Sequence, residues 1–276
     1  METGLYIVAT PIGNLGDMGQ RAVQVLRDAD LIAAEDTRHS ARLLQHFGIE
    51  SPAIPYHEHS GERAPARIVN TLRDGGTVAL ISDAGTPLIS DPGYRLVREV
   101  QAAGHKVVAI PGPCAAIAAL SVCGLPTDRF RFEGFLPAKA GARAQRLQDL
   151  VDEAASLVFY EAPHRVADAL HAMVGVFGPE REAVLVREIT KTFETVHRAP
   201  LAELHGFVVS DANQQKGEIV LVVAGRDQGD VSLDADTARL LERIAEELPG
   251  KKAAAIVAEH TGLRKRDLYD YLLGQK

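Results

Sequence analysis

Four short loops, each rich in glycine or proline and each following an apolar segment, are the parts of this sequence best suited to hold a small ligand. They lie at residues 10–14, 82–87, 111–115 and 161–163. Glycine lets a backbone approach a ligand closely, and proline fixes the shape of a loop before anything binds. Three of the four loops fall in one stretch of alternating strand and helix patterns, so we expect them to form a preformed crevice.

The nature of the ligand follows in part from motifs that these loops lack. None of them matches the Walker A pattern or Gly-x-Gly-x-x-Gly, which argues against a cradle for nucleotide phosphates and against a dinucleotide fold. The crevice better suits a ligand with a ribose and an adenine but no phosphate. S-adenosylmethionine fits that description, although the spacing alone does not single it out.

The loop at 82–87 belongs to a short repeat, because Ile-Ser-Asp occurs at 81–83 and again at 89–91. The first copy follows a strand directly, so we predict that residues 82–89 form the ligand loop. The second copy precedes a helical pattern that begins near residue 93. We predict that Ser90 or Asp91 caps that helix, with Pro92 in its first turn.

The elements that position these loops alternate between strand and helix patterns. Apolar strands at 5–10, 31–34, 77–81 and 105–110, separated by amphipathic helices, predict a mostly parallel sheet with helices on both faces. Ligands bind such sheets at the carboxyl ends of the strands. A second α/β or α+β unit, with some antiparallel pairing, begins after residue 123, and a polar segment at 225–236 leads to further helices. The predicted domains are 1–123, 124–226 and a helical extension at 227–276.

Composition is that of a soluble globular protein. The chain has 276 residues, of which 46% are apolar and 24% charged. The two cysteines give neither a disulfide framework nor a metal-binding spacing, and none of the ten histidines belongs to a convincing ligand cluster. We find no signal peptide and no run of the roughly 18–20 apolar residues that a membrane span needs. These features predict a cytoplasmic protein that needs no metal and no membrane.

The motifs also carry a resemblance to a known family. Five runs occur in order along nearly the whole chain: ATPIGNLGD (9–17), AAEDTR (33–38), ISDAGTPLISDPG (81–93), IPGPCA (110–115) and FYEAPHR (159–165). Together they resemble the tetrapyrrole methylase superfamily, and within it the branch that methylates the ribose 2′-oxygen of a cytidine in 16S ribosomal RNA. The resemblance implies two α/β domains with S-adenosylmethionine in the cleft between them, and a homodimer.

The resemblance implies which residues contact the cofactor. Gly85 opens the run that matches the superfamily's Gly-Asp-Pro loop, although Thr86 stands where the aspartate would be. Asp83 could instead accept from the methionine ammonium or the ribose hydroxyls, and Tyr160 matches the wall near the adenine. The full predicted set is Pro11, Ser82, Asp83, Ala84, Gly85, Leu88, Ile89, Pro113, Cys114, Ala115, Tyr160, Gly217 and Glu218.

Methyl transfer to a ribose hydroxyl mainly requires alignment of the oxygen with the methyl group, and a proton acceptor would help. Glu35 and Asp36 are candidates because they follow the second predicted strand, where the crevice should lie. Asp36 is equally well explained as a helix N-cap, and Arg38 could pair with it or with an RNA phosphate. Lys191 could be a base if burial lowers its pKa, a phosphate contact, or part of a structural ion pair.

A basic segment at the end of the chain bears on the substrate. The net charge of the whole chain is −7, yet residues 251–276 carry six lysines and arginines against three acids. Arg264, Lys265 and Arg266 open the second helix of a predicted helix-turn-helix, where phosphate or groove contacts occur. The alternative is a small helical cap with a solvated basic end.

The predicted function is therefore S-adenosylmethionine-dependent, in-line methylation of a cytidine 2′-hydroxyl in the decoding region of 16S rRNA, with the small ribosomal subunit as partner. Two rival functions remain open at this point. One is methylation of a tetrapyrrole or corrinoid precursor, and the other is a non-enzymatic RNA-binding factor.

Overall fold

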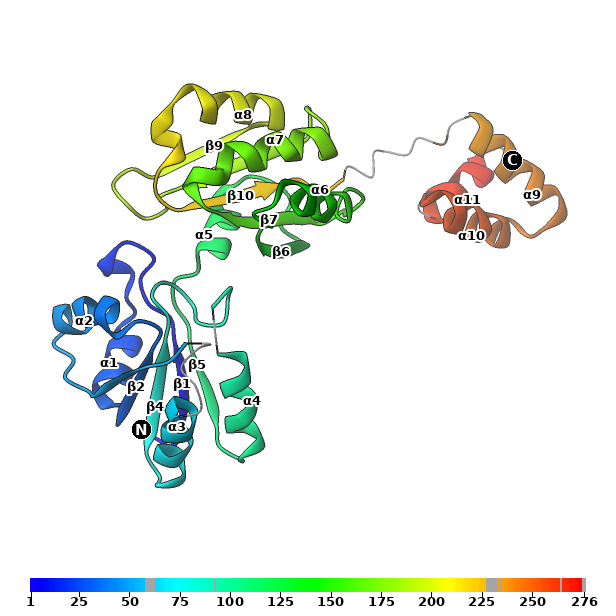
Figure 1. Ribbon diagram of the computed structural model, residues 1–276. Helices are drawn as coiled ribbons and strands as arrows, with labels where there is room; N and C mark the ends of the chain where they lie inside the picture. Colours follow the sequence, from blue (N-terminus) through cyan, green and yellow to red (C-terminus); the bar gives the residue numbers. More distant parts are fainter. Residues whose placement is uncertain (58–62, 92, 227–232, 234, 264, 275–276) are drawn as a thin grey trace. The chain divides into compact units, whose positions relative to one another are not determined.

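The computed structural model describes residues 1–57, 63–91, 93–226, 233, 235–263 and 265–274. The chain forms two compact units, residues 1–226 and 227–276 (Figure 1). The first unit contains two separate β-sheets, and the second contains helices. We describe the two units one after the other.

The first sheet consists of five strands in the order β3-β2-β4-β1-β5, and every pair of neighbours is parallel. Its strands are β1 (Gly4–Val8), β2 (Leu31–Ala34), β3 (Ala53–Pro55), β4 (Thr77–Ile81) and β5 (Val107–Ile110). Strands β2 and β4 are buried along their whole length, and only Thr77 among their residues is polar, as expected for parallel strands that are covered on both faces.

Helices cover both faces of this sheet. One face packs against α1 (Gln20–Asp28) and α2 (Thr37–His46) through a core that includes Leu26 and Leu44. The other face packs against α3 (Arg63–Arg73) and α4 (Tyr94–Ala102) through Ile68 and Leu96 (Figure 1). The predicted strand-helix alternation thus produces the expected three layers.

Local signals explain where the helices begin and end. The side chain of Asp36 accepts a hydrogen bond from the backbone N–H of Arg38 at 2.8 Å, so it caps the N-terminus of α2. Gly48, with φ of +60°, follows the C-terminus of the same helix. The N-terminal boundary lies where the sequence predicts it.

The second sheet has the order β6-β7-β10-β8-β9 and is mixed. Strands β6 and β7 are parallel, whereas β10 runs antiparallel to both of its neighbours and β9 runs antiparallel to β8. Its strands are β6 (Phe130–Phe135), β7 (Ser156–Glu161), β8 (Glu182–Arg187), β9 (Thr195–Pro200) and β10 (Ile219–Val223). The carboxyl ends of β6, β7 and β8 and the amino end of β10 therefore lie at one edge.

Alternate residues of these strands enter two different cores. One face packs against α6 (Ala140–Gln148), α7 (Val166–Phe177) and α8 (Leu201–Ser210). The other face packs against α5 (Ala115–Val122), whose Ala119 and Leu120 contact valines of β7, β8 and β10. Helix α5 follows the last strand of the first sheet but packs on the second sheet. The predicted division at residue 123 thus falls after a helix that structurally accompanies the second sheet.

Three elements of this unit have no clear pattern in the sequence, namely β3, β6 and α8. Strand β3 has only three residues and ends in a proline. Strand β6 is interrupted by an irregularity in its pairing between Phe132 and Gly134, which breaks the alternation that marks a strand. Helix α8 contains a glycine, so its stability depends on packing against α7 and the sheet.

The second unit consists of α9 (Ala235–Glu247), α10 (Gly250–Thr261) and α11 (Lys265–Gly274). Its core contains Leu241, Val257 and Leu268, one from each helix. Gly262 ends α10 in the left-handed conformation, and its N–H donates to the carbonyl of Ala258 at 2.9 Å. The predicted tight turn between two helices is therefore present. The architecture as a whole confirms the predicted fold class of two α/β sheets with a helical C-terminal extension.

Candidate active site

The first unit contains a cavity of about 460 Å³, a size within the usual range for small-molecule sites. Residues at the carboxyl ends of β1, β2, β4 and β5 line it on the side of the first sheet. Residues at the edge formed by β6, β7, β8 and β10 line it on the side of the second sheet. Its lining residues are Ile12, Glu35, Asp83, Ala84, Gly85, Thr86, Ile89, Ser90, Asp91, Cys114, Ala115, Phe135, Tyr160, Glu161, Ala162, Pro163, Ile189, Glu218, Ile219 and Val220. All four predicted loops contribute to this lining, and together they supply ten of the twenty residues.

Hydrogen bonds tie the loops on the first-sheet side to one another. Thr10 and Gly85 exchange two backbone bonds, of 2.9 and 3.1 Å, and so join the first loop to the second. The Thr86 hydroxyl donates to the carbonyl of Pro113 at 2.9 Å and joins the second loop to the third. The threonine that replaces the aspartate of the superfamily's motif thus holds two loops together. These bonds make this part of the wall preformed.

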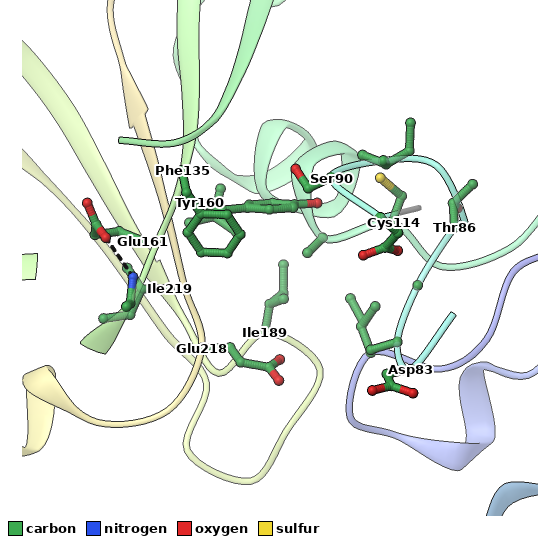
Figure 2. Close-up of a pocket in the computed structure, with 18 of the residues that line it drawn as sticks. Asp83, Thr86, Ser90, Cys114, Phe135, Tyr160, Glu161, Ile189, Glu218 and Ile219 are labelled. Atoms are coloured by element: carbon green, nitrogen blue, oxygen red, sulfur yellow. Dashed lines mark hydrogen bonds between the residues drawn. The ribbon is translucent and has the colours of Figure 1, made fainter. Parts of the chain in front are cut away.

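The opposite side of the cavity carries aromatic rings. Tyr160 lies edge-on to Phe135 and Phe132, with ring centroids 5.7 and 4.9 Å apart, and Figure 2 shows Tyr160 and Phe135 opposite Asp83 and Thr86. The hydroxyl of Tyr160 accepts the backbone N–H of Ala116 at 3.2 Å, which fixes the ring against the start of α5. Burial raises the pKa of Tyr160, so the hydroxyl stays neutral. Such a wall can stack against a flat heteroaromatic group.

The charge of the cavity is one-sided. Its described lining residues include five acids, Glu35, Asp83, Asp91, Glu161 and Glu218, and no lysine, arginine or histidine. Glu161 turns its carboxylate away from the cavity, where it lies 3.5 Å from Arg165 (Figure 2). Glu218 is paired with Lys191, so the negative potential comes mainly from Glu35, Asp83 and Asp91. A cavity of this kind favours a cationic ligand and disfavours a phosphate.

Asp91 corrects the interpretation of the Ile-Ser-Asp repeat. The residue that caps α4 is Gly93, and the cap makes no side-chain hydrogen bond. Ser90 and Asp91 line the cavity instead, so both copies of the repeat contribute to it and the predicted cap was wrong. Burial raises the pKa of Asp91 to about 6, and the nearby Glu35 and Asp83 add to this effect although a hydrogen bond from Ser82 opposes it. Pro92 lies outside the described residues.

The three predicted base candidates occupy different environments. Glu35 lines the cavity, and its Oε2 accepts the backbone N–H of Asp83 at 3.3 Å. The hydrogen bonds from Arg38 lower the pKa of Asp36 to about 2, so this N-cap is a poor base. Arg38 itself is 90% exposed and paired with Asp36 at 2.8 Å.

Lys191 is an ion-pair partner in the structure. Its Nζ lies 2.8 Å from Oε1 of Glu188 and 3.1 Å from Oε2 of Glu218. Burial lowers the pKa of Lys191, but the hydrogen bonds to the two glutamates outweigh it, so the pKa is raised overall. The condition under which Lys191 would act as a base, a lowered pKa, is therefore not met.

The predicted cofactor residues divide into two sets. Those that line the cavity are Asp83, Ala84, Gly85, Ile89, Cys114, Ala115, Tyr160 and Glu218. The others, namely Pro11, Ser82, Leu88, Pro113 and Gly217, lie outside that lining. Leu88 packs into the core below the sheet and has a positive φ of 73°. The space beside Gly217 is filled by Glu188, because a Cβ atom there would lie 2.3 Å from Oε1 of that glutamate.

Sequence reasoning missed several lining residues. Phe135 ends β6, which the sequence does not predict, and nothing in the sequence indicates that Phe135 lies beside Tyr160. Asp91 could have been found by asking whether both copies of the repeat face one ligand. Ile189 lies in a loop whose backbone is strained, since Glu188 and Thr190 have φ of +52° and +68°. Positive φ at such residues has no signature in the sequence.

The predicted RNA-binding residues of the C-terminal extension lie at the start of α11. Lys265 and Arg266 are exposed, and Arg266 lies 3.6 Å from Asp270. Arg264 lies outside the described residues. In the described parts of the chain no helix is long and apolar enough to cross a membrane, and no group of three histidines, cysteines or acids is placed to hold a metal.

Comparisons with known proteins decide the family. A family model described as tetrapyrrole (corrin/porphyrin) methylases matches residues 4–205, and one described as RsmI C-terminal HTH domain matches residues 231–276. The ribosomal RNA small subunit methyltransferase I of Pseudomonas aeruginosa is 58% identical over 271 residues, which cover 98% of this chain and 96% of that protein. This chain belongs to the ribosomal RNA small subunit methyltransferase I family.

Other relatives and solved structures agree with that placement. The family member of Escherichia coli O157:H7 is 52% identical over 272 residues, covering 99% of this chain and 95% of that protein. A uroporphyrin-III-C-methyltransferase from Thermus thermophilus superposes with a TM-score of 0.58 at 21% identity, covering 80% of this chain and 94% of that chain. A cobalt precorrin-4 methyltransferase gives a TM-score of 0.61 at 14% identity, covering 80% and 94%. These two likenesses show the tetrapyrrole methylase fold, and the curated relatives confirm the predicted family and methyltransferase activity.

Proposed function

We propose that this methyltransferase uses S-adenosylmethionine to methylate the ribose 2′-hydroxyl of a cytidine in the decoding region of 16S rRNA, by direct in-line transfer. The observation that carries the proposal is the combination of a methylase cavity and a C-terminal helix-turn-helix unit in one chain. Members of the ribosomal RNA small subunit methyltransferase I family from Pseudomonas aeruginosa and Escherichia coli align with this chain, both parts included, over nearly their full length.

The cavity residues fit this cofactor on three counts. Its volume of about 460 Å³ suits a nucleoside with an amino-acid side chain. The ring of Tyr160, next to Phe135, offers a surface for an adenine. The described lining residues include acids but no lysine, arginine or histidine, which matches a ligand that carries a sulfonium and an ammonium and no phosphate.

When bound, the cofactor supplies an activated methyl group, so the protein must mainly orient the acceptor oxygen. The loops around Gly85 and Pro113 are joined by hydrogen bonds that keep this side of the cavity rigid, which favours precise orientation of the acceptor oxygen. Glu35 is the one predicted base candidate that lines the cavity, whereas Asp36 and Lys191 are held in ion pairs. We therefore propose Glu35 as the group that takes the hydroxyl proton.

The substrate part of the proposal rests on the second unit. Lys265 and Arg266 lie exposed at the start of α11, where the second helix of a helix-turn-helix contacts nucleic acid. We propose that this unit, with Arg38 and Arg264, contacts 16S rRNA of the small ribosomal subunit, and that the protein acts as a homodimer in the cytoplasm.

Labelled S-adenosylmethionine tests the proposal. We expect the full chain to transfer label to 16S rRNA of small subunits that lack the modification, and a chain ending at residue 226 to bind cofactor but transfer far less. A corrinoid precursor serves as the competing substrate. Label in the corrinoid and none in the rRNA would refute the proposal, as would subunit binding without any cofactor binding.

A further inference from the structure

Asp91 differs from the other acids of the cavity in its hydrogen bonding. Oδ1 of Asp83 accepts the backbone N–H of Asp36 at 3.1 Å, and Oε2 of Glu35 accepts that of Asp83. These two carboxylates brace the ends of β2 and β4 against each other. For Asp91 the Ser82 hydroxyl, which donates to the carbonyl of Ala84 at 3.3 Å, acts only to lower the pKa of the carboxyl group, and no basic side chain lines the cavity in the described part of the chain.

Among the described residues that line the cavity, the groups around Asp91 are acidic or neutral. Glu35 comes from the end of β2 and Asp83 from the end of β4, and both raise the pKa of Asp91. From the other side come the hydroxyl of Tyr160 on β7 and the thiol of Cys114 before α5. Glu218, before β10, also lines the cavity, but its carboxylate is paired with Lys191 at 3.1 Å. The described residues that line the cavity therefore offer an ionised, half-buried Asp91 no compensating positive charge in the free protein.

We propose that Asp91 holds a cationic group of the methyl donor and gives up its proton as the donor binds. This inference rests on the proposed use of S-adenosylmethionine, which carries two cations, an ammonium and a sulfonium. Either cation would supply the missing charge, and the proton passes from the carboxyl group to the solvent buffer. Asp91 is in this sense the residue that selects for the charge of the cofactor.

Because Asp91 loses its proton on binding, the proposal predicts a measurable proton release and a pH-dependent affinity. The pKa of Asp91 is about 6 in the free protein, so close to half of the molecules carry the proton at pH 6. A bound cation lowers that pKa, so binding at pH 6 releases roughly half a proton per site if the shift is two units or more. For the same reason the affinity at pH 5 is expected to be about tenfold weaker than at pH 7. The ammonium of the cofactor, with a pKa of about 8, stays charged over this range.

Isothermal titration of the full chain with S-adenosylmethionine measures the released proton directly. Titrations at pH 6 in two buffers of different ionisation enthalpy give the proton count, and titrations at pH 5 and pH 7 give the change in Kd. We expect Asp91→Asn to abolish both the proton release and the pH dependence of Kd. The matched control is Asp83→Asn, which we expect to bind more weakly but to keep both.

The outcomes separate the inference from the function on which it rests. Binding without proton release, or proton release that survives in Asp91→Asn, would overturn the inference and leave the proposed cofactor intact. No binding at any pH would refute the cofactor and the inference together. S-adenosylhomocysteine, which keeps the ammonium but lacks the sulfonium charge, then identifies the partner. Proton release with both ligands assigns the ammonium, and release with S-adenosylmethionine alone assigns the sulfonium.

Discussion

Gly85 lies where three loops of the cavity meet, and replacing it by valine should disable the site while leaving the protein folded. Its φ is +80°, a conformation that residues with a Cβ atom avoid. A Cβ atom at this position would lie 3.2 Å from Cγ2 of Ile12 and 3.6 Å from the carbonyl oxygen of Pro113. The two γ methyl groups of valine would extend further into these neighbours.

A second glycine separates backbone strain from damage to the site. Gly75 has a similar φ of +86°, but no atom lies within 4 Å of the position of its Cβ. Left-handed backbone costs a residue with a Cβ atom roughly 1–2 kcal/mol. Both Gly75→Val and Gly85→Val should therefore lose at least about that much free energy of unfolding, which lowers Tm by about 2–4 °C per kcal/mol in a domain of this size.

The effect on cofactor binding should differ sharply between the two variants. In Gly85→Val the crowding can be relieved only by displacing Ile12 or the Pro113 loop, and both belong to the wall of the cavity or are bonded to it. We expect the Kd for S-adenosylmethionine to rise at least 100-fold, equivalent to about 2.7 kcal/mol, and to stay unchanged in Gly75→Val. Isothermal titration gives Kd, and thermal unfolding shows that both variants fold.

One outcome would contradict the assignment of this loop to the cofactor site. If Gly85→Val loses stability to the same extent as Gly75→Val and still binds S-adenosylmethionine with unaltered affinity, the loop at 82–87 does not belong to the cofactor site.

Three further predictions concern single features of the structure. Tyr160→Phe should lower the free energy of unfolding by about 1 kcal/mol, because the N–H of Ala116 loses its acceptor, and urea unfolding measures this loss. The same variant should hardly change the Kd for the cofactor, so a Kd raised more than tenfold would contradict the prediction. Asp91→Asn should raise Tm at pH 7.5 and not at pH 4. The pKa of Asp91 is about 6 in the native state and near 4 in the unfolded state, so the native state loses stability as the pH rises through this interval. The variant cannot ionise at this position and escapes that loss. An equal Tm at pH 7.5 would show that ionised Asp91 costs no stability. Replacing Lys265 and Arg266 by alanine should weaken binding to small subunits and reduce the slope of log K against log salt by up to about 2, whereas an unchanged slope would make α11 purely structural.

Most of the first sheet could be predicted from the sequence because its signals are local. The buried strands β2 and β4 begin and end at the predicted residues, and the capping of α2 by Asp36 needs only the neighbouring N–H groups. Strand β6 could not be predicted, because its irregular pairing and its charged residues are stabilised by distant partners. Glu133, for example, has an almost fully buried side chain that pairs with Arg146 of α6 at 2.5 Å.

The same distinction applies to the site. The loop around Gly85 follows from its glycine and proline and from the family's motifs. The position of Asp91 depends on the path of the chain after Ile89, where Ser90 adopts a positive φ of 68° that no local signal predicts. The basic residues of α6 likewise depend on distant contacts, because the side chain of Arg143 is buried and Arg146 pairs with Glu133.

The most direct test of the central claim identifies the atom that receives the methyl group. Small subunits that lack the modification are incubated with the full chain and methyl-labelled S-adenosylmethionine, and the 16S rRNA is then hydrolysed with alkali. A methyl group on a ribose 2′-oxygen blocks cleavage at the following phosphate, so the account predicts that the label appears in an alkali-resistant dinucleotide that begins with cytidine. Label recovered in a mononucleotide would place the methyl group on a base, and unlabelled rRNA would exclude it as the substrate; either result would contradict the account.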